Sequence, residues 1–103
     1  MRRIIALKRL REFWQEHGEA ETPLREWYKV ASKAGWRNLQ EVRRTYPGAD
    51  AVKVDSGATL TVFNIGGGKY RLITSIWYGG GQVYIKTVLT HAEYSKDRWK
   101  KWF

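Results

Sequence analysis

The first half of the chain has the apolar spacing of helices. Apolar residues recur at steps of three and four positions in three stretches, the period at which one helix face turns toward a core. The expected boundaries are Leu7 and His17 for the first helix, Thr22 and Gly35 for the second, and Asn38 and Pro47 for the third. Before them, the short apolar run from Arg2 to Ala6 predicts a strand.

In the second half the pattern changes to alternation. Strands are predicted at Thr59 to Ile65, Lys69 to Tyr78 and Gln82 to Thr90. The glycine triplets Gly66–Gly68 and Gly79–Gly81 are suited to the hairpin turns between them. We expect a loop from Pro47 to Ala58 and a short helical segment in the basic C-terminal stretch, Tyr94 to Phe103. This order predicts one α+β domain over residues 1–103, with N-terminal helices packed on a small antiparallel sheet.

The second hairpin predicts which residues share a face of the sheet. If it closes at its glycine triplet, residues whose numbers sum to 161 lie opposite each other, so that Arg71 faces Thr90. The polar face would then carry Arg71, Ser75, Trp77, Tyr84, Lys86 and Thr90. The core face would carry Leu72, Ile76, Val83, Ile85 and Leu89. Ile73 and Val88 break this division, so the polar face is expected to be only partly open.

A cluster of chemical groups is expected where the last predicted strand ends. Thr90 and Glu93 have the spacing of a capping box, which would start a helical turn with His91 in its first position. Tyr94 follows three residues later, on the same side of the turn as His91. With Arg71 alongside and the turn's backbone amides free, this place would suit an anion such as a phosphate.

Composition narrows the class of partner and of chemistry. The chain has 19 Lys and Arg against 10 Asp and Glu, a net charge of +9, which favours nucleic acid as the partner. It has no cysteine and two histidines, so we expect no metal site and no cofactor. No apolar run is long enough to span a membrane, and the start of the chain does not resemble a signal peptide, so we expect a cytoplasmic protein.

These residue types fit metal-free cleavage of RNA. The reaction needs a base for the ribose 2′-OH, an acid for the leaving 5′ oxygen and positive charge at the phosphate, which His91, Tyr94, Arg71 and Lys86 would supply. The expected RNA contacts are Lys69, Trp77, Tyr84, Arg98, Lys100 and Lys101. Each residue also has a structural interpretation: His91 as a hydrogen-bonding strand end, Arg71 as a solvated residue and Tyr94 as a core ring.

Two motifs resemble the HigB-type toxins of bacterial toxin–antitoxin pairs. One runs from Val62 to Ile73 and the other from Val83 to Tyr94; Leu10–Trp14 and the stretch from Pro23 to Tyr28 are also similar to family members. The resemblance implies a RelE-like fold and ribonuclease activity on messenger RNA, commonly on the ribosome. It also implies neutralisation by a HigA-type antitoxin with a helix-turn-helix domain. The family often has an aspartate where this chain has Ser95.

Two other functions remain open at this stage. The chain would be a non-catalytic RNA- or ribosome-binding module if His91 is only structural. A toxin of the ParE type, from the same superfamily, would instead inhibit DNA gyrase and leave transcripts intact. The pairing of His91 with Tyr94 favours the ribonuclease.

Overall fold

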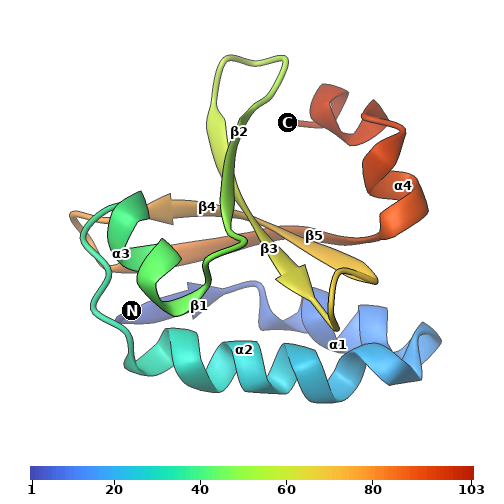
Figure 1. Cartoon of the computed structure of the whole chain (residues 1–103), viewed down its shortest axis with the longest axis horizontal. Coiled ribbons are helices and arrows are strands. Elements are labelled where there is room, and N and C mark those ends of the chain that lie inside the picture. Colours follow the sequence, from blue (N-terminus) through green and yellow to red (C-terminus); the bar gives the residue numbers. More distant parts are fainter.

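The computed structural model describes all 103 residues and shows a five-stranded sheet with two helices on one face (Figure 1). The sheet order is β1-β5-β4-β3-β2, and all neighbours are antiparallel except β1 and β5. The strands are β1 (Arg3–Ile5), β2 (Asp50–Lys53), β3 (Thr59–Ile65), β4 (Tyr70–Trp77) and β5 (Gln82–Thr90). The helices are α1 (Leu7–Glu16), α2 (Glu21–Lys33), α3 (Leu39–Thr45) and α4 (His91–Ser95), with 3₁₀ turns at Gly18–Ala20 and Arg98–Lys101. None of the helices combines the length and apolar character needed to cross a membrane.

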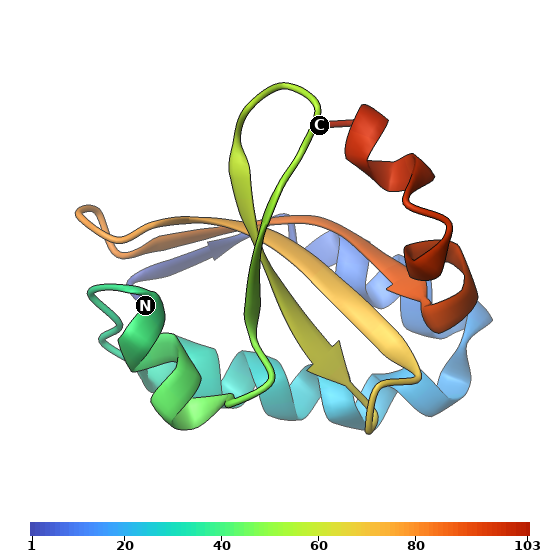
Figure 2. The same ribbon diagram turned by 45° about the horizontal axis from the view of Figure 1, so that its top comes forward.

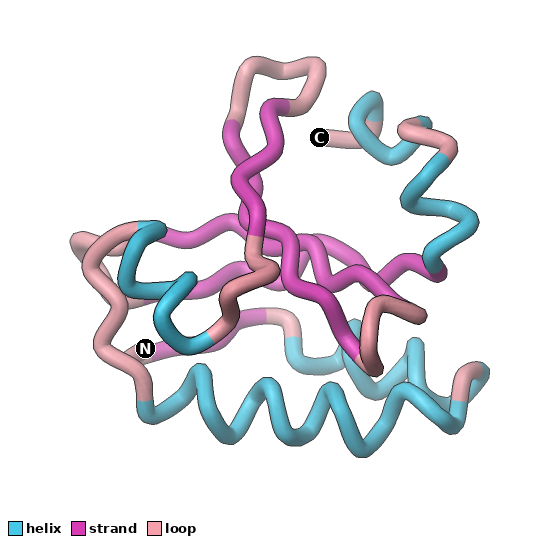
Figure 3. Tube along the Cα trace, viewed as in Figure 1, coloured by secondary structure: helices cyan, strands magenta, loops and turns pink.

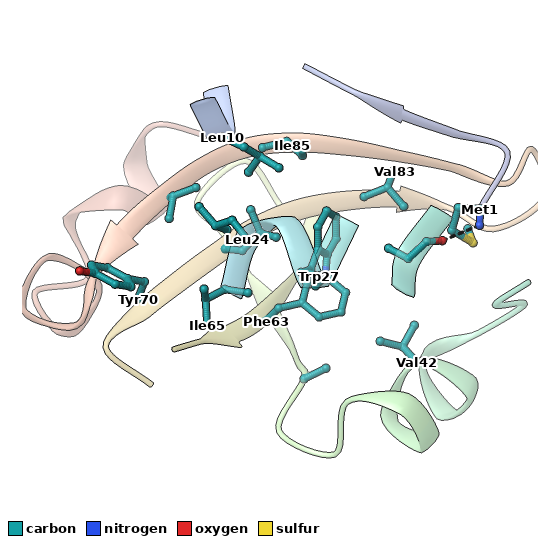
Figure 4. Close-up of a cluster of buried hydrophobic side chains, with 14 of the residues drawn as sticks. Met1, Leu10, Leu24, Trp27, Val42, Phe63, Ile65, Tyr70, Val83 and Ile85 are labelled. Atoms are coloured by element: carbon teal, nitrogen blue, oxygen red, sulfur yellow. Dashed lines mark hydrogen bonds between the residues drawn. The ribbon is translucent and has the colours of Figure 1, made fainter. Parts of the chain in front are cut away.

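The main core lies between the sheet and the helices α1 and α2. Trp27 of α2 meets Phe63 of β3 edge to face, with ring centroids 5.3 Å apart, near the middle of this core (Figure 4). Leu10 of α1 and Leu24 of α2 are buried in the same cluster. The helical apolar spacing therefore identified the helix faces that pack on the sheet.

A second, smaller core lies on the opposite face of the sheet, which we call the outer face. The C-terminal segment after β5 folds back over this face (Figure 2). Trp99 is only 1% exposed and packs with Ile73 of β4 and Leu89 of β5. The C-terminal segment is thus part of the packed domain, and it covers one end of the outer face.

The register predicted for the second hairpin is wrong for two reasons: the turn spans residues 78–81, so that Trp77 pairs with Gln82, two positions from the predicted partner, and β5 contains a β-bulge further along. Near the turn Ser75 pairs with Tyr84, whereas beyond the bulge Arg71 pairs with Leu89, and Lys86 has no partner. One extra residue exchanges the two faces of a strand, so Leu89 shares the outer face with Arg71, and Thr90 does not. The same exchange explains why Val88 broke the predicted division of faces: beyond the bulge it faces the main core.

Most other predicted elements are confirmed, with two exceptions. The predicted loop from Pro47 to Ala58 contains strand β2, which pairs with β3 in a hairpin that projects from the sheet (Figure 3). Alternation over four residues was too short a signal to predict it. Thr22 does not cap the second helix, which starts at Glu21 directly after a 3₁₀ turn. Asn38 does cap α3, accepting a hydrogen bond from the Glu41 amide.

Candidate active site

The candidate site is at the end of the outer face that adjoins α4. Arg71 of β4 and Tyr94 of α4 meet there, whereas the contacts of His91 are with Ser95 within α4 and those of Lys86 are with Arg9 and Phe103. The predicted capping box is present: the Thr90 hydroxyl accepts from the Glu93 amide, and the Glu93 carboxylate accepts from the Thr90 amide at 3.0 Å. This box fixes the direction in which α4 leaves the sheet.

Arg71, Tyr94 and Trp99 form a stack. The Arg71 guanidinium carbon lies 5.2 Å from the centroid of the Tyr94 ring, a cation–π distance. The Trp99 ring lies 5.3 Å from the same ring and is nearly parallel to it. Arg71 also donates to the Gly68 carbonyl and Trp99 donates to the Tyr94 carbonyl at 3.1 Å. The predicted contact between Arg71 and Tyr94 is therefore confirmed. The sequence did not predict that Trp99 stacks on the Tyr94 ring.

The Tyr94 phenol is held in its neutral form. Burial raises its pKa above the usual value, and nearby Asp50 adds to the rise, while Arg71 and Lys100 oppose it. A protonated phenol can donate a hydrogen bond or a proton, and the raised pKa makes that proton harder to release unless a nearby positive charge favours the phenolate. The adjacent guanidinium of Arg71 would stabilise the phenolate left after proton transfer.

His91 occupies the first position of α4, as predicted, with its side chain exposed. Its Nδ1 atom lies 3.4 Å from the Ser95 hydroxyl oxygen, and that hydroxyl lies 2.9 Å from the His91 carbonyl oxygen. A carbonyl only accepts, so the hydroxyl proton goes to the carbonyl and the hydroxyl oxygen accepts from Nδ1–H. In this tautomer Nε2 carries the lone pair, and on an exposed side chain it is available to take a proton.

Replacing Ser95 with alanine should change the proton distribution of the His91 ring. We expect the population with the proton on Nδ1 to fall, measured by imidazole ¹⁵N chemical shifts, because the accepting oxygen is gone. RNA cleavage should slow by about 2- to 10-fold, the equivalent of one net hydrogen bond of about 0.5–1.5 kcal/mol. Ser95→Thr keeps the hydroxyl and should behave as the parent; unchanged ¹⁵N shifts in Ser95→Ala would contradict the assignment.

The start of α4 offers fewer free amides than the sequence suggested. The His91 amide donates to the Lys69 carbonyl at 2.9 Å, and the Glu93 amide is taken by the Thr90 hydroxyl. The Glu93 carboxylate also occupies this end of the helix. The backbone amides therefore contribute less to phosphate binding here than expected, and most of the positive charge comes from side chains such as Arg71.

Lys86 is the unpaired residue of the bulge, and Arg9 of α1 binds the backbone there. The Arg9 guanidinium donates to the Ile85 and Lys86 carbonyls, at 3.0 and 2.8 Å. The Lys86 ammonium lies 5.9 Å from the centroid of the Phe103 ring, on the side of the second core. Sequence reasoning missed Arg9, although the irregular position of Val88 was a signal of the bulge; Ile73 is irregular for another reason, because it packs in the second core on the outer face.

Arg9→Met should lower the free energy of unfolding by about 1–2 kcal/mol, because two carbonyls lose a charged donor at a partly exposed position. Urea denaturation measures this, and Arg11→Met, in the same helix without such bonds, is the matched control. If the effect of Arg9 on cleavage comes from positioning Lys86, Arg9→Met should cause no further loss of cleavage activity in protein that already carries Lys86→Ala. Additive losses of activity would contradict that coupling.

Comparison with known protein families gives a match over most of the chain. Residues 20–97 match the profile of the HigB toxin family, the RelE-like toxic component of a toxin–antitoxin system. The chain belongs to this family. The matched range includes Arg71, Lys86, His91 and Tyr94, and the resemblance noted in the sequence is confirmed at this level.

Individual HigB proteins cover most of the chain. The mRNA interferase toxin HigB of Escherichia coli K12 is 25% identical over 92 residues, which are 88% of this chain and 86% of the relative. The mRNA interferases HigB of Escherichia coli O157:H7 and of Shigella flexneri have the same identity and coverage. The chain is thus similar to these proteins over nearly their whole length.

In this HigB toxin the six residues expected to contact RNA lie at two ends of the sheet. The residues near α4 are Lys69, Arg98, Lys100 and Lys101; those near the β4–β5 turn are Trp77 and Tyr84. Lys69 and Lys100 have nearby carboxylates, Glu19 at 3.5 Å and Asp97 at 3.3 Å. Such exposed pairs are weak, so both ammonium groups remain able to bind phosphate. His, Asp and Glu side chains do not come together in groups of three or more that would hold a metal ion.

Proposed function

We propose that this HigB toxin is an mRNA interferase, a metal-independent endoribonuclease. The observation that carries the proposal is the contact between the Arg71 guanidinium and the protonated Tyr94 phenol beside the helix that bears His91. A cation for the phosphate, a proton donor and an imidazole are the groups that RNA cleavage requires. The names of the related HigB proteins support RNA as the substrate.

In the proposed reaction the ribose 2′ oxygen attacks the neighbouring phosphorus and the bond from phosphorus to the 5′ oxygen breaks. His91 Nε2 takes the 2′-OH proton, and Tyr94 gives its proton to the departing 5′ oxygen. The products are a 2′,3′-cyclic phosphate and a free 5′-OH. Arg71 and Lys86 stabilise the negative charge that builds up on the phosphate oxygens in the transition state.

The proposal also covers partners and place of action. The substrate is messenger RNA on the translating ribosome, in the cytoplasm, and the antitoxin is of the HigA type with a helix-turn-helix domain. Membership of a toxin–antitoxin family supports an antitoxin partner. A net charge of +9 supports binding to messenger RNA and to ribosomal RNA, because phosphate contacts dominate nucleic-acid affinity.

The test is brief expression in bacteria with mapping of transcript 5′ ends, alongside cleavage by purified protein, with ribosomes in Mg²⁺ and with a high concentration of free RNA in EDTA. We expect new 5′-OH ends within translated regions, and residual cleavage of the free RNA that persists in EDTA. Growth arrest with intact transcripts would refute the proposal. Blocked DNA replication would then indicate a gyrase inhibitor, and arrested translation without cleavage would indicate a binding module.

A further inference from the structure

The far end of the outer face, beside the β4–β5 turn, carries an exposed tryptophan that the proposed cleavage chemistry does not use. Trp77 is the last residue of β4 and its side chain is 58% exposed. Tyr84 of β5, also on this face, is 37% exposed. In Figure 1 this turn and α4 lie at opposite ends of the sheet. More than half of the surface of this tryptophan is therefore open to solvent.

The Trp77 ring is nevertheless held in place, because it packs against the backbone of the β4–β5 turn. A Cβ atom on Gly80 would lie 2.4 Å from the Trp77 ring, so the ring packs directly on the Gly80 backbone. Gly80 does not have a positive φ angle, unlike Gly81, so its backbone does not require glycine. What requires glycine at position 80 is room for the indole. One side of the ring is therefore fixed and much of its surface remains open.

Polar and basic groups share a row with the exposed ring. Gln82 of β5 pairs with Trp77 on one side and with Arg3 of β1 on the other, so all three side chains lie on the outer face in one line across the sheet. The Gln82 amide oxygen accepts from the Tyr84 hydroxyl, which leaves the amide N–H groups free to donate. Arg3 is exposed, and the charge it adds is suited to a phosphate.

We propose that Trp77, Gln82 and Arg3 form a second RNA-binding site that stacks one unpaired nucleobase and binds its phosphate. A fixed, open ring offers the stacking surface, Gln82 offers donors to a base edge, and Arg3 offers the charge. The inference rests on the proposed function for its ligand, single-stranded messenger RNA. Ribosomal RNA has the same chemistry and is separated from it by the test below.

The separation of the two sites makes the proposal sensitive to RNA length. Trp77 lies six residues along β4 from Arg71, or roughly 20 Å at about 3.3 Å per residue. A dinucleotide at the cleavage site does not reach this far, whereas a strand of several nucleotides does. Loss of the second site should therefore weaken binding of a longer RNA and leave a dinucleotide unaffected.

The experiment measures RNA affinity in full-length His91→Ala protein, which keeps the RNA intact. Trp77→Leu should raise the Kd for a single-stranded RNA of about 10 nucleotides by about 10-fold, and Trp77→Phe, which keeps a ring, should restore most of it. Gly80→Ala should weaken binding similarly, because its methyl group displaces the indole. Gly35→Ala, where a methyl group meets nothing within 4 Å, is the matched control. Arg3→Gln should reduce the dependence of log Kd on log salt by about one ion.

Wild-type affinity for the longer RNA in both Trp77→Leu and Gly80→Ala would overturn the proposal. So would an equal loss for a dinucleotide, since that would mean damage to the cleavage site. Weaker binding to ribosomes lacking messenger, with unchanged oligonucleotide binding, would overturn messenger RNA as the ligand. These binding results are independent of cleavage, so a failure of the proposed ribonuclease activity would appear separately, in the transcript map.

Discussion

Replacing His91 with alanine is expected to slow RNA cleavage by about 10²- to 10⁴-fold, the usual contribution of a general base. The residue is exposed and bonds only within α4 and to Lys69 through its backbone, so the fold should be unaffected. Single-turnover cleavage measures the chemical step, and circular dichroism checks the fold.

The other histidine provides the control for this prediction. His17 lies at the end of α1, stacked on Phe13 at 4.2 Å and outside the candidate site. His17→Gln should keep cleavage within a few-fold of the parent, with any loss tracking stability. If His91→Ala also cleaves within about 10-fold of the parent, the imidazole is not the base and its role is structural.

Arg71→Met is the second large effect, with an expected fall in kcat of about 10²- to 10³-fold. The guanidinium would stabilise charge that forms only in the transition state, so kcat should change more than KM. Arg71→Lys keeps the charge but loses the planar group that stacks on Tyr94, and its activity should be intermediate. Steady-state kinetics on a defined RNA separates the two constants.

A structural loss accompanies Arg71→Met, because Arg71 also bonds the Gly68 carbonyl. Arg25→Met is a matched control: its guanidinium lies 4.8 Å from the Trp14 ring, on the helical side of the molecule. This control removes a similar cation–π contact and should leave cleavage intact. A change in KM alone for Arg71→Met would assign Arg71 to RNA binding and not to the transition state.

The local elements could be predicted because local sequence determines them. Helical spacing around Leu10, Leu24 and Trp27 identified the buried helix faces. The Thr90–Glu93 capping box and the glycine turns depend on residues a few positions apart, and both are present. The candidate residues Arg71, His91 and Tyr94 could be found for the same reason, since their strand and helical turn follow these local rules.

The arrangement of the site depended on contacts between distant parts of the chain. The bulge at Lys86 changes which face Leu89 and Thr90 occupy, and Arg9, 77 positions away from Lys86, holds it. Alternation within one strand does not show where an extra residue falls, because only pairing with the neighbouring strand reveals it.

The C-terminal segment gives a second example. Its tryptophans looked alike in the sequence, yet Trp99 is buried under Tyr94 while Trp102 is 60% exposed. The sequence by itself determined the elements, the basic charge and the residue types of the candidate site. Only the tertiary structure decided the strand register, the stacking of Trp99 on Tyr94 and the packing of the Trp77 ring on Gly80, because each depends on a contact in space that the spacing of residue types along the chain does not specify.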